Sequence, residues 1–204
     1  MRKDSSLNAD AWVVKIGGSL YNSKYLIHWL DAISSFSGKN LIIVPGGGPF
    51  ADQVRQVDDK FNLDQYCAHN MAVLAMQQYG NMLVSLCPSL VAVNSIEKIR
   101  QVWDSSKTAV WEPYEMVRDQ CTLDKSWDVT SDSLALWFAS LLEIKNLLLV
   151  KSSEYVLETT DLEMLEKSGC IDSTLQEFAK HNHINIHVSH KSKVEILPGL
   201  LHPN

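Results

Sequence analysis

The stretch Ala11-Trp-Val-Val-Lys-Ile-Gly-Gly-Ser19 determines how the rest of the sequence is interpreted. It is a short run of β-branched and apolar residues that ends abruptly in two glycines. A short apolar run bounded by turn residues is typical of a buried β-strand. The segment Tyr25 to Phe36 then carries apolar residues three and four positions apart, which predicts a helix that covers this strand.

The same order of elements recurs at Leu41-Ile-Ile-Val-Pro-Gly-Gly-Gly48. An apolar run again ends in glycines, and Pro49 is well placed to begin another helix. Strands that alternate with helices form parallel sheets that are covered on both faces. We therefore predict an α/β fold, a three-layer sandwich with a mainly parallel central sheet and helices on both faces.

The remaining periodic segments extend this pattern to the end of the chain. We expect helices over residues 64–86, 96–102, 131–142 and 173–180, and a short one after Glu112-Pro113. We expect strands over residues 90–93, 108–110, 146–150 and 184–188. Because no internal repeat, linker or low-complexity segment interrupts the pattern, we predict one domain over residues 11–204, preceded by a flexible lead-in over residues 1–10.

Composition narrows the class of protein. The chain has 204 residues, of which 46% are hydrophobic, so it can bury one sizeable core. The formal net charge of -6 argues against nucleic-acid and anionic-membrane partners, which need clustered positive charge. No two cysteines have CxxC spacing, no apolar run approaches the roughly 20 residues that span a membrane, and no signal-peptide pattern is present. We therefore expect a cytoplasmic protein.

The glycine loops and the lysine beside one of them are candidates for phosphate binding. Glycine lets a backbone N–H turn toward a phosphate without a Cβ in the way, and Lys15 adds a positive charge. A tight turn beside a solvated lysine explains this first loop equally well. The three glycines at 46–48 are a stronger signal, because each costs about 0.5–1 kcal/mol relative to alanine. Ligands of open α/β sheets also bind at the carboxyl ends of strands.

Two further charged residues lie at the ends of predicted elements. Asp132 stands at the start of a helix, where it is ordinarily explained by the helix dipole. Lys151 follows a buried strand, where it is ordinarily solvated. The combination is more specific than either residue. A phosphoryl-transfer site needs positive charges and backbone donors around the transferred group, and a carboxylate that holds the lysines.

The order of these motifs resembles the amino acid kinase superfamily, which includes acetylglutamate, aspartate, uridylate and isopentenyl phosphate kinases. Four segments carry the resemblance: Lys15–Ser19, Leu41–Gly48, Thr130–Ala135 and Leu147–Lys151. They span most of the chain, which contains neither a Walker A nor a GxGxxG motif. The resemblance implies the amino acid kinase fold, transfer of the γ-phosphate of ATP to a small acceptor, Mg²⁺ that arrives with ATP, and association into homo-oligomers.

A narrower resemblance points to a short branch of this superfamily. It rests on Ala68–Met76 with Tyr79-Gly80, on Trp127–Asp132, and on the ending Gly199–Pro203. The branch includes an archaeal kinase of methanofuran biosynthesis that acts on an aminomethyl-furanmethanol phosphate. The resemblance implies an acceptor that already carries a phosphate, a diphosphate product, and a place in the biosynthesis of a C1 carrier.

Matched positions imply the following roles. The catalytic residues would be Lys15, Asp132 and Lys151. The nucleotide would be bound by Gly17, Gly18, Ser19, Thr130 and Ser131. The acceptor would be bound by Gly46, Gly47, Gly48, His69, Asn70, Trp127 and Asp128. We expect no resident metal site, because the histidines at 181–190 have no cysteine or acidic ligand in a specific pattern with them.

The chain also departs from the superfamily. Many relatives continue the third strand into Asp-Val-Asp-Gly-Val and carry a later Gly-Gly-Met stretch, whereas here the strand leads into Ser152–Leu157. The nucleotide-binding part is therefore abbreviated. Two alternatives remain open: a carboxylate kinase, which needs an arginine such as Arg55 near the triple glycine, and a non-catalytic nucleotide-binding or storage protein. The presence of Lys15 and Asp132 argues against the second alternative.

Overall fold

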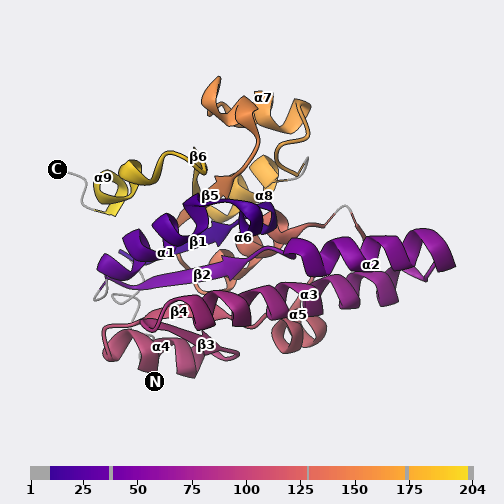
Figure 1. Ribbon diagram of the computed structural model, residues 1–204, viewed down its shortest axis with the longest axis horizontal. Coiled ribbons are helices and arrows are strands. Elements are labelled where there is room, and N and C mark those ends of the chain that lie inside the picture. Colours follow the sequence, from indigo (N-terminus) through magenta and orange to yellow (C-terminus); the bar gives the residue numbers. More distant parts are fainter. Residues whose placement is uncertain (1–9, 37–38, 128, 173–174, 202–204) are drawn as a thin grey trace.

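The computed structural model describes residues 10–36, 39–127, 129–172 and 175–201, except for the side chain of Glu177. One sheet of six parallel strands crosses it in the order β3-β4-β2-β1-β5-β6 (Figure 1). The strands are β1 (Trp12–Ile16), β2 (Leu41–Pro45), β3 (Leu90–Val93), β4 (Thr108–Trp111), β5 (Asn146–Lys151) and β6 (Asn185–His190). The predicted α/β fold with a parallel sheet is thus confirmed.

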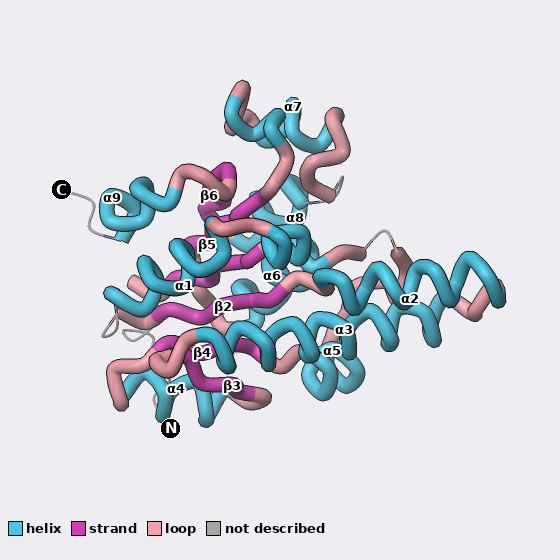
Figure 2. Tube along the Cα trace, in the orientation of Figure 1, coloured by secondary structure: helices cyan, strands magenta, loops and turns pink. Residues whose placement is uncertain are grey.

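Helices cover both faces of the sheet, as Figure 2 shows. They are α1 (Tyr25–Ser35), α2 (Gly48–Phe61), α3 (Gln65–Leu86), α4 (Ile96–Asp104), α5 (Tyr114–Gln120), α6 (Ser131–Leu141), α7 (Leu162–Lys167), α8 (Leu175–Asn182) and α9 (Leu197–Leu201). Helices α1 and α9 pack on one face with the carboxyl-terminal half of α3. Helices α4, α5, α6 and α8 pack on the other.

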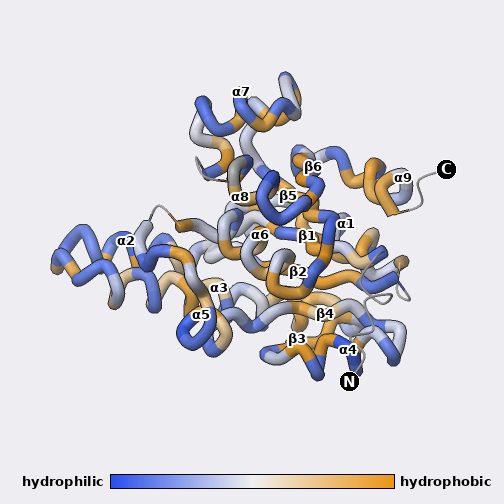
Figure 3. Tube along the Cα trace, turned by 180° about the vertical axis from the view of Figure 1, so that it is seen from behind, coloured by the Kyte–Doolittle hydropathy of each residue, from blue (hydrophilic) through white to orange (hydrophobic). Residues whose placement is uncertain are grey.

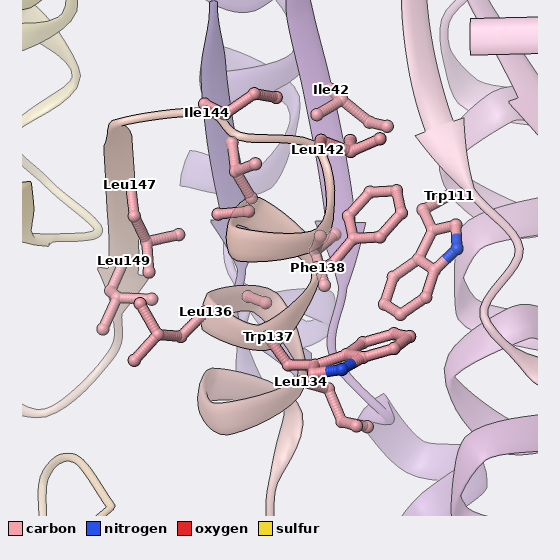
Figure 4. Packing of buried hydrophobic residues seen from close by; sticks show 14 of the residues in the cluster. Ile42, Trp111, Leu134, Leu136, Trp137, Phe138, Leu142, Ile144, Leu147 and Leu149 are labelled. Carbon is pink, nitrogen blue, oxygen red and sulfur yellow. The ribbon is translucent and has the colours of Figure 1, made fainter. Parts of the chain in front are cut away.

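The central strands β1, β2 and β5 are mostly apolar because both faces of the sheet are buried there. In β1, Val13 packs against the α6 side, while Val14 and Ile16 pack against the α1 side. Figure 4 shows the core on the α6 side, where the rings of Trp111 and Phe138 stack with centroids 4.0 Å apart. In contrast to these strands, α2 is largely hydrophilic, as Figure 3 shows.

Helices α2 and α3 lie side by side and project beyond the edge of the sheet (Figure 1). Asn62 ends α2 in the left-handed conformation, with φ of 50°. The side chain of Asp64 then caps α3 by accepting a hydrogen bond from the N–H of Cys67 at 2.9 Å. The pair forms a long arm whose base reaches the carboxyl ends of the strands.

Most predicted elements are confirmed to within two residues at their ends. Residues 173 and 174, where the last predicted helix begins, lie outside the described part, as do residues 1–9 of the predicted lead-in. The short helices α7 and α9 and the 3₁₀ turns Gly18–Asn22, Glu154–Leu157 and Val194–Ile196 are not predicted from the sequence. Among the described residues, no helix is both long and apolar enough to cross a lipid bilayer.

Candidate active site

The predicted phosphate-binding elements meet at one edge of the sheet. Strands β2, β1 and β5 are neighbours, and their registers pair Ile16 with both Pro45 and Val150. The loops that follow these strands therefore emerge side by side. This places the glycine loop after β1, the triple glycine after β2 and Lys151 at the same edge, where ligands of parallel sheets bind.

The two glycine loops touch through their backbones. A Cβ on Gly18 would lie 2.2 Å from the nitrogen of Gly48, and a Cβ on Gly46 would lie 2.3 Å from the nitrogen of Gly18. Gly48 also has a positive φ of 56°, which favours glycine. Glycine is therefore required at Gly18 and Gly46, because any side chain there would push the two loops apart.

The backbone N–H groups of these loops serve two purposes. Those of Gly17 and Gly46 hold the loops in place, because they donate to the carbonyls of Val150 at 3.2 Å and Ile16 at 2.9 Å. In the same two loops, the amides of Gly18, Ser19, Gly47 and Gly48 have no acceptor among the described residues. All four belong to residues that line a single hollow of about 300 Å³. They form a cluster of donors suited to phosphate oxygens.

Asp132 joins two lysines in this site. Its Oδ1 lies 2.7 Å from the ammonium of Lys15, and its Oδ2 accepts a hydrogen bond from the ammonium of Lys151. Asp132 is 1% exposed and Lys15 is 4% exposed, so this pair is shielded from water. The three predicted catalytic residues therefore form one contiguous ion cluster that carries two positive charges and one negative charge.

Burial and charge act in opposite directions on the titration of this cluster. Burial alone would raise the pKa of the Asp132 carboxyl, but the charges of Lys15 and Lys151 and their hydrogen bonds hold this pKa below its usual value. Burial is also the largest influence on Lys15. It lowers the pKa of that ammonium, aided by the charge of Lys151 and opposed by Asp132. Asp132 is thus a fixed anion at neutral pH.

Asp132 is placed by the first turn of α6. Thr130 is the N-cap residue, and its hydroxyl accepts a hydrogen bond from the N–H of Asp132 at 3.2 Å. The hydroxyls of Thr130 and Ser133 both donate to the carboxylate of Asp172. The sequence gives no sign of Asp172, because it lies about 40 residues along the chain from its partners and belongs to no motif.

The hollow beside the ion cluster combines backbone donors with charged side chains. Besides the four donor residues, its walls include Lys151 and Asp132 on one side and Gly169, Cys170 and Asp172 on another. Among the described residues, no three His, Cys, Asp or Glu side chains gather into a metal-binding group. Both oxygens of Asp132 already face lysines. Mg²⁺ in this hollow would consequently be held mainly by the phosphates that carry it.

A second hollow adjoins the first and is lined mostly by apolar side chains. It is bounded by Gly47, Ala51, Arg55, His69, Ala72, Val73, Met76, Ser126, Trp127, Val129, Thr130, Ser131 and Leu134. The two hollows share Gly47, Ala51, Arg55, Thr130 and Ser131. A molecule in the second hollow can therefore present a polar end to the phosphate donors of the first.

The polar groups of the second hollow are held in defined orientations. The indole of Trp127 donates to Asp58 at 2.7 Å, and the guanidinium of Arg55 lies over the same ring, 5.1 Å from its centroid. The Nδ1 of His69 lies 3.3 Å from the carbonyl oxygen of Ser126, which can only accept, so this nitrogen carries the proton. Burial lowers the pKa of His69, so its ring is neutral at neutral pH.

Most of the predicted binding residues come together, with some differences. Gly17 and Gly46 support the loops rather than line either hollow. Asn70 is half-buried in α3 and lines neither hollow, whereas Asp128 lies outside the described residues. Arg55, which the sequence suggested only for a carboxylate acceptor, lies where the two hollows meet. The binding roles of these residues stay predictions.

Known proteins share the sequence pattern and the fold. Residues 10–162 match the model of the amino acid kinase family. The chain is similar to the (5-(aminomethyl)furan-3-yl)methyl phosphate kinase of Methanocaldococcus jannaschii, with 30% identity over 138 residues. The match covers 67% of this chain and spans 63% of the length of that relative.

Solved structures agree on the fold. The UMP kinase of Ureaplasma parvum superposes with a TM-score of 0.67 at 17% identity, covering 96% of each chain. The uridylate kinase of Archaeoglobus fulgidus superposes with a TM-score of 0.65 at 15% identity, covering 90% of this chain and 95% of its own. At such identities the likeness concerns the fold alone. The match to the family model over residues 10–162 shows that the chain belongs to the amino acid kinase family.

Proposed function

We propose that the protein is an ATP-dependent kinase that transfers the γ-phosphate to a small phosphomonoester, in the biosynthesis of a C1 carrier. One observation carries the proposal. Lys15 and Lys151 each form an ion pair with one oxygen of Asp132, which lines the same hollow as the free backbone N–H groups of the glycine loops. Phosphoryl transfer requires little covalent chemistry from the protein. It requires positive charge and fixed donors around the group in transit, which these residues supply.

The chain's own residues would divide the work as follows. The amides of Gly18 and Ser19 would bind phosphates of ATP, and those of Gly47 and Gly48 would face the acceptor side. Lys15 and Lys151 would stabilise negative charge on the transferred group, while Asp132 keeps both ammonium groups in position. Mg²⁺ would accompany ATP and neutralise part of its charge. Ser131, which lines both hollows, stays available for a phosphate oxygen.

The second hollow supports an anionic acceptor with a small ring or hydrocarbon body. Its apolar wall includes Val73, Met76 and Leu134, which can cover such a body. Arg55, at the junction of the hollows, would bind the acceptor's phosphate, because a guanidinium suits phosphate oxygens. The relative from Methanocaldococcus jannaschii is named for a substrate with a furan ring and a phosphate, which favours a phosphomonoester here.

The neutral ring of His69 adds a feature to this acceptor. With the proton on Nδ1, the free Nε2 can only accept a hydrogen bond. It would therefore bind a donor on the acceptor, such as an ammonium or a hydroxyl group. An aminomethyl group meets this requirement.

Two alternatives make different predictions. A carboxylate kinase would also use Arg55, but it would release ADP with an amino acid and not with a phosphomonoester. A non-catalytic binding protein would have no use for a buried carboxylate between two lysines. Such a cluster carries a large desolvation cost, which apolar side chains would avoid.

The test is ATP turnover, followed as coupled ADP release with a panel of acceptors. The panel contains the aminomethyl-furan phosphate, the alcohol obtained by removing its phosphate, other phosphomonoesters, and amino acids. The proposal expects release that depends on the phosphomonoester and is much weaker with the matched alcohol. Release with an amino acid alone would contradict the proposed acceptor in favour of a carboxylate kinase. ATP binding without turnover on any acceptor would favour the non-catalytic protein.

A further inference from the structure

The carboxylate of Asp172 accepts hydrogen bonds from two residues at the start of α6. It accepts from the hydroxyl of Thr130 at 2.9 and 3.0 Å and from the N–H of Thr130 at 3.3 Å. It also accepts from the N–H of Ser133 at 3.2 Å and from the hydroxyl of Ser133. Asp172 lies beyond residues 10–162, the part of the chain that matches the family model.

These contacts fix the helix turn that carries Asp132. The first turn of a helix leaves four N–H groups without partners inside the helix. Here the hydroxyl of Thr130 accepts a hydrogen bond from the N–H of Asp132, and the carboxylate of Asp172 accepts one from the N–H of Ser133. A carboxylate at this end also complements the helix dipole. The backbone on both sides of Asp132 is therefore tied down, from within the turn and from a distant part of the chain.

The position of Asp172 connects this turn to the wall of the phosphate hollow. Gly169, Cys170 and Asp172 line the hollow, on a segment that returns from α7. Figure 1 shows α7 lying away from the sheet, so this returning segment needs an anchor to form a wall. Because the donors of Thr130 and Ser133 surround the charge of Asp172, that charge is less able to repel bound phosphates.

We propose that Asp172 is a positioning residue for phosphoryl transfer. It holds the first turn of α6 so that Asp132 keeps Lys15 and Lys151 directed at the transferred group. This inference rests on the proposed kinase function. It does not require Asp172 to touch either substrate.

The experiment compares Asp172→Ala and Asp172→Asn with the matched control Asp161→Ala. Asp161 caps α7 in the same segment by accepting from the N–H of Met164 at 3.0 Å, and it lines neither hollow. We expect the Asp172 variants to lose kcat by about 10²-fold, because a small misplacement of a catalytic group is costly. KM for the acceptor should stay nearly unchanged, and KM for ATP should rise less than kcat falls. Asp161→Ala should lower thermal stability and leave kcat unchanged.

A second measurement needs no turnover. The charge of Asp172 itself raises the pKa of Lys15, so the variant used must keep that charge. The titration of Lys15 is therefore followed by NMR of labelled lysine side chains, in the wild type and in Asp172→Glu, which keeps the charge and changes only the length of the side chain. A displaced Lys15 titration together with the loss of kcat would support the inference. An unchanged titration in a variant that only loses stability would overturn it, since Asp172 would then be a simple helix cap. A displaced titration in a protein whose wild type turns over no acceptor would contradict the proposed function but not the anchoring of Asp132.

Discussion

The ammonium of Lys15 lies 2.7 Å from Oδ1 of Asp132, and both side chains are almost entirely buried. The opposite oxygen of the same carboxylate accepts from Lys151, which is partly exposed to the phosphate hollow. One anion therefore fixes the direction of two cations. The arrangement concentrates a net positive charge where a phosphoryl group would pass between two substrates.

Replacing Lys15 should abolish most of the activity. Lys15→Ala removes a positive charge from the transferred group, and we expect turnover to fall by at least about 10²-fold, as when a transition-state donor is lost. Steady-state ADP release measures the effect. The matched control is Lys107→Ala, an exposed lysine just before the amino end of β4, on the side of the sheet opposite the glycine loops. Near-normal turnover of Lys15→Ala would remove Lys15 from the catalytic role.

Replacing Asp132 should destabilise the fold. Asp132→Asn leaves Lys15 and Lys151 facing one another without the anion, and breaking a buried ion pair costs about 3–5 kcal/mol. Urea unfolding at neutral pH measures the change in the free energy of unfolding. A loss of less than about 1 kcal/mol, the value typical of an exposed ion pair, would contradict the burial of this cluster.

The same residue predicts how stability depends on pH. The pKa of Asp132 is lower in the folded protein than its usual value of about 3.9. Its contribution to the free energy of unfolding is therefore fully present at pH values above about 4. The contribution is lost as the pH falls through the lowered pKa of the folded state. Unfolding curves between neutral and acidic pH should therefore converge for the wild type and Asp132→Asn. If the difference in the free energy of unfolding between the two proteins stays constant with pH, another group causes the loss of stability in acid.

Much of this site could be predicted because its parts follow local patterns. Lys15 and the triple glycine stand where apolar strands end, and a parallel sheet brings such ends together. The sequence predicts that a carboxylate holds the lysines, but it does not predict that Lys151 contacts the oxygen of Asp132 opposite Lys15. The contact of Asp172 with Thr130 could not be predicted, because the two residues are separated in the chain by β5 and α7 and come together only in the folded protein. Helix α7 itself has six residues, too few for a periodic pattern, and is secured by the buried Leu165.

The close approach of the two glycine loops predicts a strong effect of one methyl group. Gly18→Ala would place a Cβ 2.2 Å from the nitrogen of Gly48, so the loops must separate. We expect a loss of about 1–3 kcal/mol of stability, as for other overpacked sites, together with a higher KM for ATP. Thermal unfolding and steady-state kinetics measure the two effects.

The control for this variant is Gly199→Ala in α9. Nothing lies within 4 Å of a Cβ built at Gly199. Alanine is favoured over glycine in helices, so we expect this variant to be as stable as the wild type or slightly more stable. Equal effects of the two substitutions would show that the loops adapt, and that glycine at position 18 serves no close contact.

Arg55 should determine the affinity for the acceptor. Arg55→Ala removes a guanidinium from the junction of the hollows, and a hydrogen bond to a charged group contributes about 1.5–3 kcal/mol. We expect KM for the phosphomonoester to rise by roughly 10-fold or more. The dephosphorylated alcohol should be affected much less. Arg100→Ala, an exposed arginine of α4 that lines neither hollow, serves as the control. A KM that rises equally for both acceptors would assign Arg55 to packing against Trp127.

The most direct test of the proposed function is ³¹P NMR of the reaction products formed from ATP and the aminomethyl-furan phosphate. Transfer to a phosphomonoester creates a phosphoanhydride, so two coupled phosphorus signals should replace the single signal of the acceptor as ADP accumulates. The wild type should form this diphosphate, and Lys15→Ala should form almost none. An acceptor signal that stays a singlet while ADP accumulates with an amino acid would contradict the proposed acceptor. An unchanged spectrum of both ATP and every acceptor would contradict the kinase activity itself.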